Sequence, residues 1–147
     1  MGAALPLVTL TASLVLAGPA GAAQPRTFCE RWVAADLESG TFSGCDHGAA
    51  TGGSGTAAVH PPADVLVISW ASGKTTDVDD LSITPASPGE PGGRPCPPST
   101  SEYEWHGTIS ADTTGAIPVG GSLSGDVCID FTNGTSSNKA YARIAFS

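Results

Sequence analysis

The segment from Val65 to Thr76, VLVISWASGKTT, most constrains what this chain can fold into. It opens with a short apolar run rich in β-branched and aromatic residues, which favour extended backbone. Ser72-Gly73 ends the run, and glycine at a two-residue turn lets the chain return as an antiparallel neighbour. Apolar residues occupy both faces of Val65–Trp70, so we expect a strand that is covered on both sides and around which other strands pair.

The residues after the turn do not keep one regular alternation of apolar and polar side chains. A tight turn at Ser72-Gly73 would place Val67 opposite Val78. Val78 then lies on one face of the return strand, whereas Leu81 and Ile83 lie on the other. This change of face within one strand predicts a β-bulge at the intervening aspartates.

The N-terminus carries an apolar run, Leu5–Ala17, that is too short to span a bilayer and is followed by small residues. It predicts a secretory signal peptide over residues 1–23, cleaved near Ala23, and a secreted domain over residues 24–147. The mature chain of about 120 residues is long enough for one domain with one core. We therefore expect an extracellular protein that is free of the membrane after cleavage.

The mature sequence shows no window with apolar residues at helical spacing, and Gly, Pro, Ser and Thr recur throughout. This predicts an all-β fold, either a single antiparallel β-barrel or a β-sandwich, with long Gly/Pro-rich loops and two disulfides. Beyond the central hairpin, we expect strands within Arg31–Leu37, Thr41–Cys45, Thr56–Val59, Tyr103–Ser110, Asp126–Thr132 and Tyr141–Ser147.

The four cysteines form an even set, which in an exported chain favours two disulfides over metal ligation. Three connectivities are possible. We favour Cys29 with Cys45 and Cys96 with Cys128, because each pair brackets one expected hairpin. Closing such loops would stabilise the fold by roughly 3 to 4 kcal/mol each.

The tryptophans are expected on different faces. Trp70 lies in the most apolar strand and should be in the core. In the strand expected at 31–37, the other apolar residues lie on the opposite face from Trp32, so Trp32 is expected to be exposed. Exposed aromatic rings on β-proteins can stack on sugars, which makes Trp32 and Trp105 the candidate binding residues.

The last strands can pair in two ways. Asn133-Gly134 allows a tight turn, but that register would set Ile129 opposite the polar Asn138. Pairing Ile129 with Ile144 would instead bury apolar side chains together. We therefore expect residues 133–140 to form a loop.

Several segments resemble a group of small exported actinobacterial proteins of unassigned function. They are Gly44-Cys45, Thr51–Thr56 (TGGSGT), Ile68–Thr76 (ISWASGKTT), Gly107–Gly120 (GTISADTTGAIPVG) and Val127-Cys128. The resemblance implies an extracellular β-barrel or sandwich. It carries over no catalytic residues.

Asp46 and His47 are the main candidates for chemistry, because an adjacent acid and histidine in a Gly-rich loop could ligate a metal or act as base and orienter. A hydrolase would also need a Ser or Thr nucleophile, and no Gly-x-Ser-x-Gly elbow supplies one. A solvated loop histidine is the favoured interpretation. We expect His60 and His106 on the surface as well.

Acidic residues form two further groups. Asp77, Asp79 and Asp80 lack the EF-hand spacing, so we expect a solubilising charge run rather than a calcium site. Four more carboxylates are expected on the outward faces of two neighbouring strands: Glu102, Glu104, Asp126 and Asp130. A glycosidase would need two of them across a cleft, and no cleft is indicated.

The formal net charge of −8 excludes nucleic acid and anionic membrane surfaces as partners, since both require Lys and Arg. The sequence thus predicts a secreted, non-enzymatic β domain without metal or cofactor, which binds a glycan or an extracellular protein. Two alternatives stay open: a carbohydrate- or small-ligand-binding barrel that uses Trp32 and Trp105, and a hydrolase that uses Asp46 and His47. A ligand-sized apolar mouth would favour the first, whereas a barrel interior filled by side chains would count against it.

Overall fold

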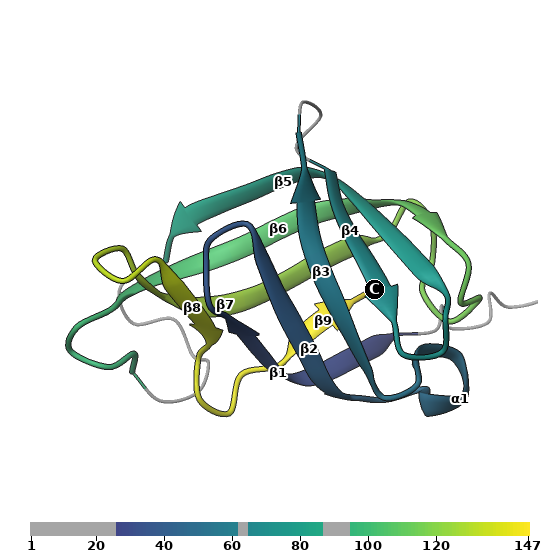
Figure 1. Ribbon diagram of the computed structural model, residues 1–147, viewed down its shortest axis with the longest axis horizontal. Helices are drawn as coiled ribbons and strands as arrows, with labels where there is room; N and C mark the ends of the chain where they lie inside the picture. The colour runs from purple at the N-terminus through teal and green to yellow at the C-terminus, as the bar shows by residue number, and fades with distance from the viewer. Residues whose placement is uncertain (1–25, 62–64, 87–94) are drawn as a thin grey trace, which may run out of the picture.

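The computed structural model describes residues 26–61, 65–86 and 95–147 (Figure 1). These residues form nine strands and one short helix, so the prediction of an all-β fold is confirmed. The strands are β1 (Thr27–Ala34), β2 (Ser39–Cys45), β3 (Ser54–His60), β4 (Val65–Trp70), β5 (Thr75–Pro85), β6 (Ser101–Asp112), β7 (Ser122–Asp130), β8 (Thr135–Asn138) and β9 (Ile144–Phe146). The helix is α1 (Gly48–Thr51).

The nine strands close into a barrel. Strands β1 to β7 each pair antiparallel with their neighbours in sequence. Strands β8 and β9 share the interval between β7 and β1, because each pairs with both of them. The result is a closed eight-stranded antiparallel barrel with one extra strand, and closure leaves no long unpaired edge.

Strand β4 is part of the barrel wall and buries one face only. Leu66, Ile68 and Trp70 are buried, whereas Ser69 is exposed. The expectation that this strand is covered on both sides is wrong, because one face of a barrel wall meets solvent. Its apolar outward residues, Val65 and Val67, are half-buried.

The turn after β4 is longer than expected. The amide of Trp70 donates to the carbonyl oxygen of Lys74 at 2.8 Å, so four residues, 71–74, separate the strands. Val78 consequently pairs with Leu66, and the expected pairing of Val78 with Val67 is wrong. The hairpin itself is present where the sequence predicts it.

The predicted β-bulge is confirmed in β5. Its register against β6 shifts between Asp79 and Ser82, and Asp80 adopts a positive φ of 52°. The extra residues bring Leu81 into contact with the core on the same side as Val78. The bulge therefore keeps the second half of β5 apolar toward the barrel interior.

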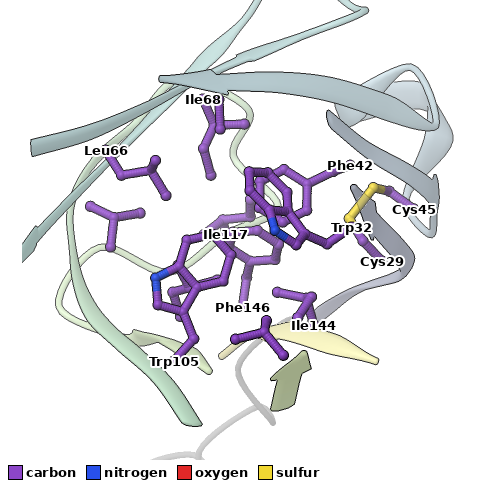
Figure 2. Packing of buried hydrophobic residues seen from close by; sticks show 14 of the residues in the cluster. Cys29, Trp32, Phe42, Cys45, Leu66, Ile68, Trp105, Ile117, Ile144 and Phe146 are labelled. Atoms are coloured by element: carbon purple, nitrogen blue, oxygen red, sulfur yellow. A yellow bond between two sulfur atoms is a disulfide. The ribbon is translucent and has the colours of Figure 1, made fainter. Parts of the chain in front are cut away.

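Aromatic rings fill the interior (Figure 2). The ring of Trp32 lies 4.6 Å from that of Phe42 and 5.0 Å from that of Trp105, and Phe42 lies 5.5 Å from Phe146. Gly40 is required beside this cluster, since a Cβ there would lie 2.3 Å from the Trp32 ring. Packing of this kind makes the barrel a filled core rather than a channel.

The sequence-based expectation of which β1 side chains point into the barrel is wrong. Trp32 is 5% exposed, whereas Val33 is 40% exposed, the reverse of what we expected. The strand also begins earlier, at Thr27, and its alternation shifts after Cys29 because two consecutive residues are exposed. Leu37 lies beyond the strand, in the turn.

Both predicted disulfides are confirmed. Cys29–Cys45 joins β1 to β2 and is buried with the core, and Cys96–Cys128 ties the segment before β6 to β7. The described residues contain no free cysteine. Crosslinks closing loops of these lengths stabilise a fold by about 3 to 4 kcal/mol each on the chain-entropy account.

The last strands pair differently from the expectation. Ile129 faces Ser136 across a β7–β8 hairpin, and Ile144 pairs with Cys29 instead. The predicted loop over 133–140 is therefore wrong, because residues 135–138 form β8. Ile129 buries its side chain against the barrel interior, so its cross-strand neighbour need not be apolar.

The two ends of the barrel differ. At one end, which we call the closed end, α1 and the β6–β7 loop cover the interior, at the right of Figure 1, and that loop inserts the buried Ile117. At the other, which we call the mouth, lie the β1–β2 and β7–β8 turns. Among the described residues, no helix is long and apolar enough to cross a bilayer. The expected signal peptide (1–23) and residues 87–94 of the Pro-rich loop lie outside the described residues.

Candidate functional site

A small cavity of about 40 Å³ opens at the mouth, and we call it the mouth pit. Its walls are mostly apolar and include Trp32, Leu37, Leu66, Leu81, Ile83 and Trp105. Leu37 and Ile83 are 51% and 48% exposed, so this part of the pit lining meets solvent. A space of this size holds about three water molecules, or one end of a larger molecule.

The β5 bulge and the neighbouring strands shape this pit. Trp105 on β6 lies between Ile83 on β5 and Gly125 on β7. The bulge determines the face of Ile83, and without it that side chain would point outward. The predicted irregularity in β5 thus places an apolar wall at the mouth.

Trp32 and Trp105 meet in the pit. Both are 5% exposed, and the indole Nε1 of Trp32 donates to Ser136 Oγ at 3.0 Å. Trp105 Nε1 is buried and has no hydrogen-bond partner among the described residues. A buried N–H without a partner costs about 1–3 kcal/mol.

The position of Trp105 Nε1 on its ring decides which groups could accept a hydrogen bond from it. In Figure 2 it lies on the edge of the Trp105 ring directed away from Phe42 and Phe146. Trp105 also lines the mouth pit, so the unpartnered N–H belongs to a side chain that forms part of a mostly apolar cavity wall. A group that accepted a hydrogen bond there would remove the desolvation cost.

Binding by Trp32 and Trp105 stays a prediction, but their expected exposure is wrong. Trp32 and Trp105 do lie together, yet neither offers an open ring face, so the expected exposed platform for a sugar is wrong. Sequence reasoning missed Leu37 and Ser136 as pit residues. The only signal for the pit was the change of face at Ile83.

Asp46 and His47 lie near the closed end, far along β2 from the mouth. The Asp46 carboxylate accepts the backbone N–H of Phe28 at 2.6 Å. His47 Nδ1 lies 3.3 Å from Thr27 Oγ1, but this hydroxyl is fully buried and donates to the carbonyl of Ala116 at 3.2 Å. The pair holds the start of β1 in place, and the Thr27 hydroxyl beside His47 is buried.

The outward carboxylates gather on β6 and β7, as the sequence predicts for three of them. Glu104 is the cross-strand partner of Asp126, and His106 Nε2 lies 3.6 Å from a Glu104 oxygen. Glu102 forms an ion pair of 2.5 Å with the buried Lys139. Partial burial raises the pKa of Asp126; the charge of Lys139 opposes this, while those of Glu102 and Glu104 add to it.

Asp130 lies apart from this group. Its carboxylate accepts the side-chain amide of Asn133 at 2.8 Å and the backbone N–H groups of Asn133 and Thr132, and these bonds fix the β7–β8 turn and lower the Asp130 pKa. The two carboxylates that remain, Glu104 and Asp126, line a shallow groove on the outer wall. That groove also contains Arg143.

Among the described residues, no group of three or more His, Cys, Asp or Glu side chains is arranged so that it could hold a metal ion. This includes Asp77, Asp79 and Asp80 of β5. His60 is exposed at the end of β3.

No protein-family model, curated protein or solved structure matches this chain. The resemblance to small exported actinobacterial proteins therefore stays a prediction. Function has to be inferred from the geometry of the barrel.

Proposed function

We propose that this protein is an exported, non-catalytic β-barrel whose mouth pit binds one end of a small, largely apolar ligand. The buried, unpartnered Nε1 of Trp105 beside an apolar cavity carries the proposal. Small-molecule sites combine apolar walls with a few placed polar groups that fix orientation. The mouth pit has this composition.

Export is supported by the two disulfides, because such crosslinks persist in oxidising compartments. The apolar N-terminal run adds to this, as does a net charge of −8, which keeps an exported domain soluble. The Cys96–Cys128 crosslink also attaches to β7 between Val127 and Ile129, which line the pit.

The non-catalytic part of the proposal follows from the pit's lining. Glu38 is its one ionisable residue within the described part of the chain. General acid–base work needs a second group in hydrogen-bond reach of the reacting atoms. The Asp46–His47 pair lies at the other end of the barrel.

The ligand would enter between Leu37 and Ile83, whose exposed portions would cover the part that stays outside. The pit itself accepts only a ring edge or a short chain, given its volume of about 40 Å³. Binding therefore buries apolar rim surface as well as the pit wall, and each buried Å² contributes about 25 cal/mol.

A fragment screen on the mature protein tests this function. Compounds would be ranked by thermal shift and located by the NMR signals of the indole N–H groups. We expect hits to perturb Trp32 and Trp105 and to lose binding in Leu37→Glu and Ile83→Glu.

Val119→Glu is the matched control, because Val119 is 61% exposed and lies in the β6–β7 loop at the closed end. It should bind hits as the wild type does. Hits that bind all three variants equally, or a screen without any hit at these two indoles, would contradict the proposal.

A further inference from the structure

We infer that the mouth pit selects an uncharged ligand whose inserted end carries a hydrogen-bond-accepting oxygen, of the ketone, ester or ether type, for Trp105 Nε1. This inference rests on the proposed binding function and names the ligand class. It follows from which polar groups the pit offers and which it has already used.

The first step concerns the direction of the hydrogen bond. An indole N–H can donate but cannot accept. Trp105 Nε1 is without a partner in the described part of the chain, so the group that satisfies it must be an acceptor. An ammonium or guanidinium group has no acceptor atom and would leave the indole N–H without a partner.

The second step concerns the number of acceptors. The other indole N–H in the pit, that of Trp32, already donates to Ser136 Oγ at 3.0 Å. One free donor therefore remains between the two tryptophans. A carbonyl or ether oxygen matches it and brings no N–H or O–H of its own that would need a partner in an apolar cavity.

The third step concerns charge. Glu38 lines the pit and contributes a negative charge at its edge. A carboxylate or phosphate ligand would be repelled by it and would also lose hydration among apolar walls. The net charge of −8 disfavours an anion further. The acceptor is therefore expected to be neutral.

Three cyclic probes of similar size separate these possibilities: cyclopentanone, cyclopentane and cyclopentanecarboxylate. NMR titration of the mature protein should show cyclopentanone binding about 2- to 10-fold more tightly than cyclopentane, as one net hydrogen bond provides. The ketone should move the Trp105 indole N–H signal downfield, and the hydrocarbon should not. The carboxylate should bind most weakly, and Glu38→Gln should reduce the difference in affinity between the carboxylate and the other two probes.

The variant Trp105→Phe removes the donor and keeps an aromatic ring. We expect it to bind ketone and hydrocarbon equally. Trp70→Phe is the matched control, since the Trp70 indole is already bonded within the barrel, and the ketone preference should survive there. The probe ratio and the indole shift in the wild type need no variant, so they stand even if Trp105→Phe fails to fold.

The possible failures are distinct. Equal binding of ketone and hydrocarbon in the wild type, still abolished by Ile83→Glu, would overturn the ligand class and leave the binding function intact. Equal binding of ketone and hydrocarbon is also the expected result if a water molecule is the only acceptor for the N–H of Trp105. Tightest binding by the carboxylate would also overturn the inference. If no probe perturbs the pit and the fragment screen is equally empty, the proposed function falls as well.

Discussion

The two ends of this barrel treat a buried tryptophan in opposite ways. Toward the closed end, Trp70 Nε1 donates to Thr76 Oγ1 at 2.8 Å, and that hydroxyl donates to Asp112 Oδ1 at 2.6 Å. At the mouth, Trp105 Nε1 has no partner among the described residues. Both indoles are nearly fully buried, so burial alone does not explain the difference. It shows that this chain can satisfy a buried indole N–H, as it does at Trp70 and at Trp32, and leaves only that of Trp105 without a partner among the described residues.

The packing around the two tryptophans also differs, since it is more complete at the closed end than at the mouth. The closed end inserts Ile117 into the interior and joins its loops by hydrogen bonds, such as Lys74 Nζ to the carbonyl of Thr114 at 3.3 Å. The mouth leaves Leu37 and Ile83 about half exposed. One end thus contributes stability, whereas the other retains apolar surface that binding could still bury.

The largest expected effect comes from the core that both ends share. Phe42 is fully buried and contacts the rings of Trp32 and Phe146, so Phe42→Ala should lower the free energy of unfolding by about 3–5 kcal/mol. Urea denaturation of the mature protein measures this. Phe131→Ala, at a ring that is 59% exposed, is the control and should cost far less. Equal losses would mean that the interior is not the stabilising core.

The next effect concerns the crosslinks. Replacing both Cys29 and Cys45 by Ala should lower the free energy of unfolding by about 3 kcal/mol, and replacing both Cys96 and Cys128 by about 4 kcal/mol, because the second pair closes the longer loop. Calorimetric unfolding of the two double variants checks this. The Cys29–Cys45 pair is buried in the core, so a cavity could add to its cost. A loss below about 1 kcal/mol for either pair would show that the unfolded chain is already restricted there.

Much of this architecture was predictable from local patterns. The β5 bulge followed from the conflict between Val78 and Leu81, and both disulfides from their brackets around hairpins. The strand expected at Tyr103–Ser110 is present within β6, with Trp105 and Ile109 buried on one face. Each of these signals lies within one strand or one hairpin, where side-chain direction has period two.

The failures share a different cause. Trp32 was expected to be exposed because the alternation was counted within Arg31–Leu37, whereas β1 begins at Thr27. Glu30 and Arg31 are both exposed, so the face of the strand changes between them, and two polar residues in a row do not reveal this in the sequence. A hairpin from β7 into residues 135–138 was rejected because its tight-turn register set Ile129 opposite the polar Asn138, and the observed partner of Ile129, Ser136, is polar as well. In a closed barrel, apolar side chains meet across the interior as well as along the wall, and no local pattern encodes that. The mouth pit is lined by residues of every strand from β1 to β8, so it could not be found before the fold was known.

A smaller effect isolates the contrast between the two tryptophans. Trp70→Phe and Trp105→Phe remove similar ring area, but only the first removes a hydrogen bond and leaves Thr76 Oγ1 without its donor. We expect Trp70→Phe to lower the free energy of unfolding by about 1 kcal/mol more than Trp105→Phe. Thermal and urea unfolding of the two variants provide the comparison. A greater loss at Trp105 would mean that its N–H already has a partner of comparable strength in the free protein.

The smallest effects concern pH, and they contrast the outer wall with the mouth. The Asp126 pKa is raised, so ionising this acid costs more in the folded protein, and the cost develops as pH rises from the ordinary value of 3.8 through the raised one. The Asp130 pKa is lowered by bonds from Asn133 and Thr132, so its ionised form stabilises the mouth turn above pH 3.8 and this stabilisation is lost as pH falls through the lowered pKa.

Asp126→Asn should therefore gain stability relative to the wild type as pH rises above 3.8, while Asp130→Asn should lose stability at neutral pH and little below the lowered pKa. Urea unfolding of both variants across the acid range measures the two slopes. The slopes have opposite signs because Asp126 is crowded by acids on the wall, whereas Asp130 is held by donors in its own turn. Parallel slopes would indicate that a common factor, such as net charge, governs both sites, and the distinction between wall and mouth would then not extend to their carboxylates.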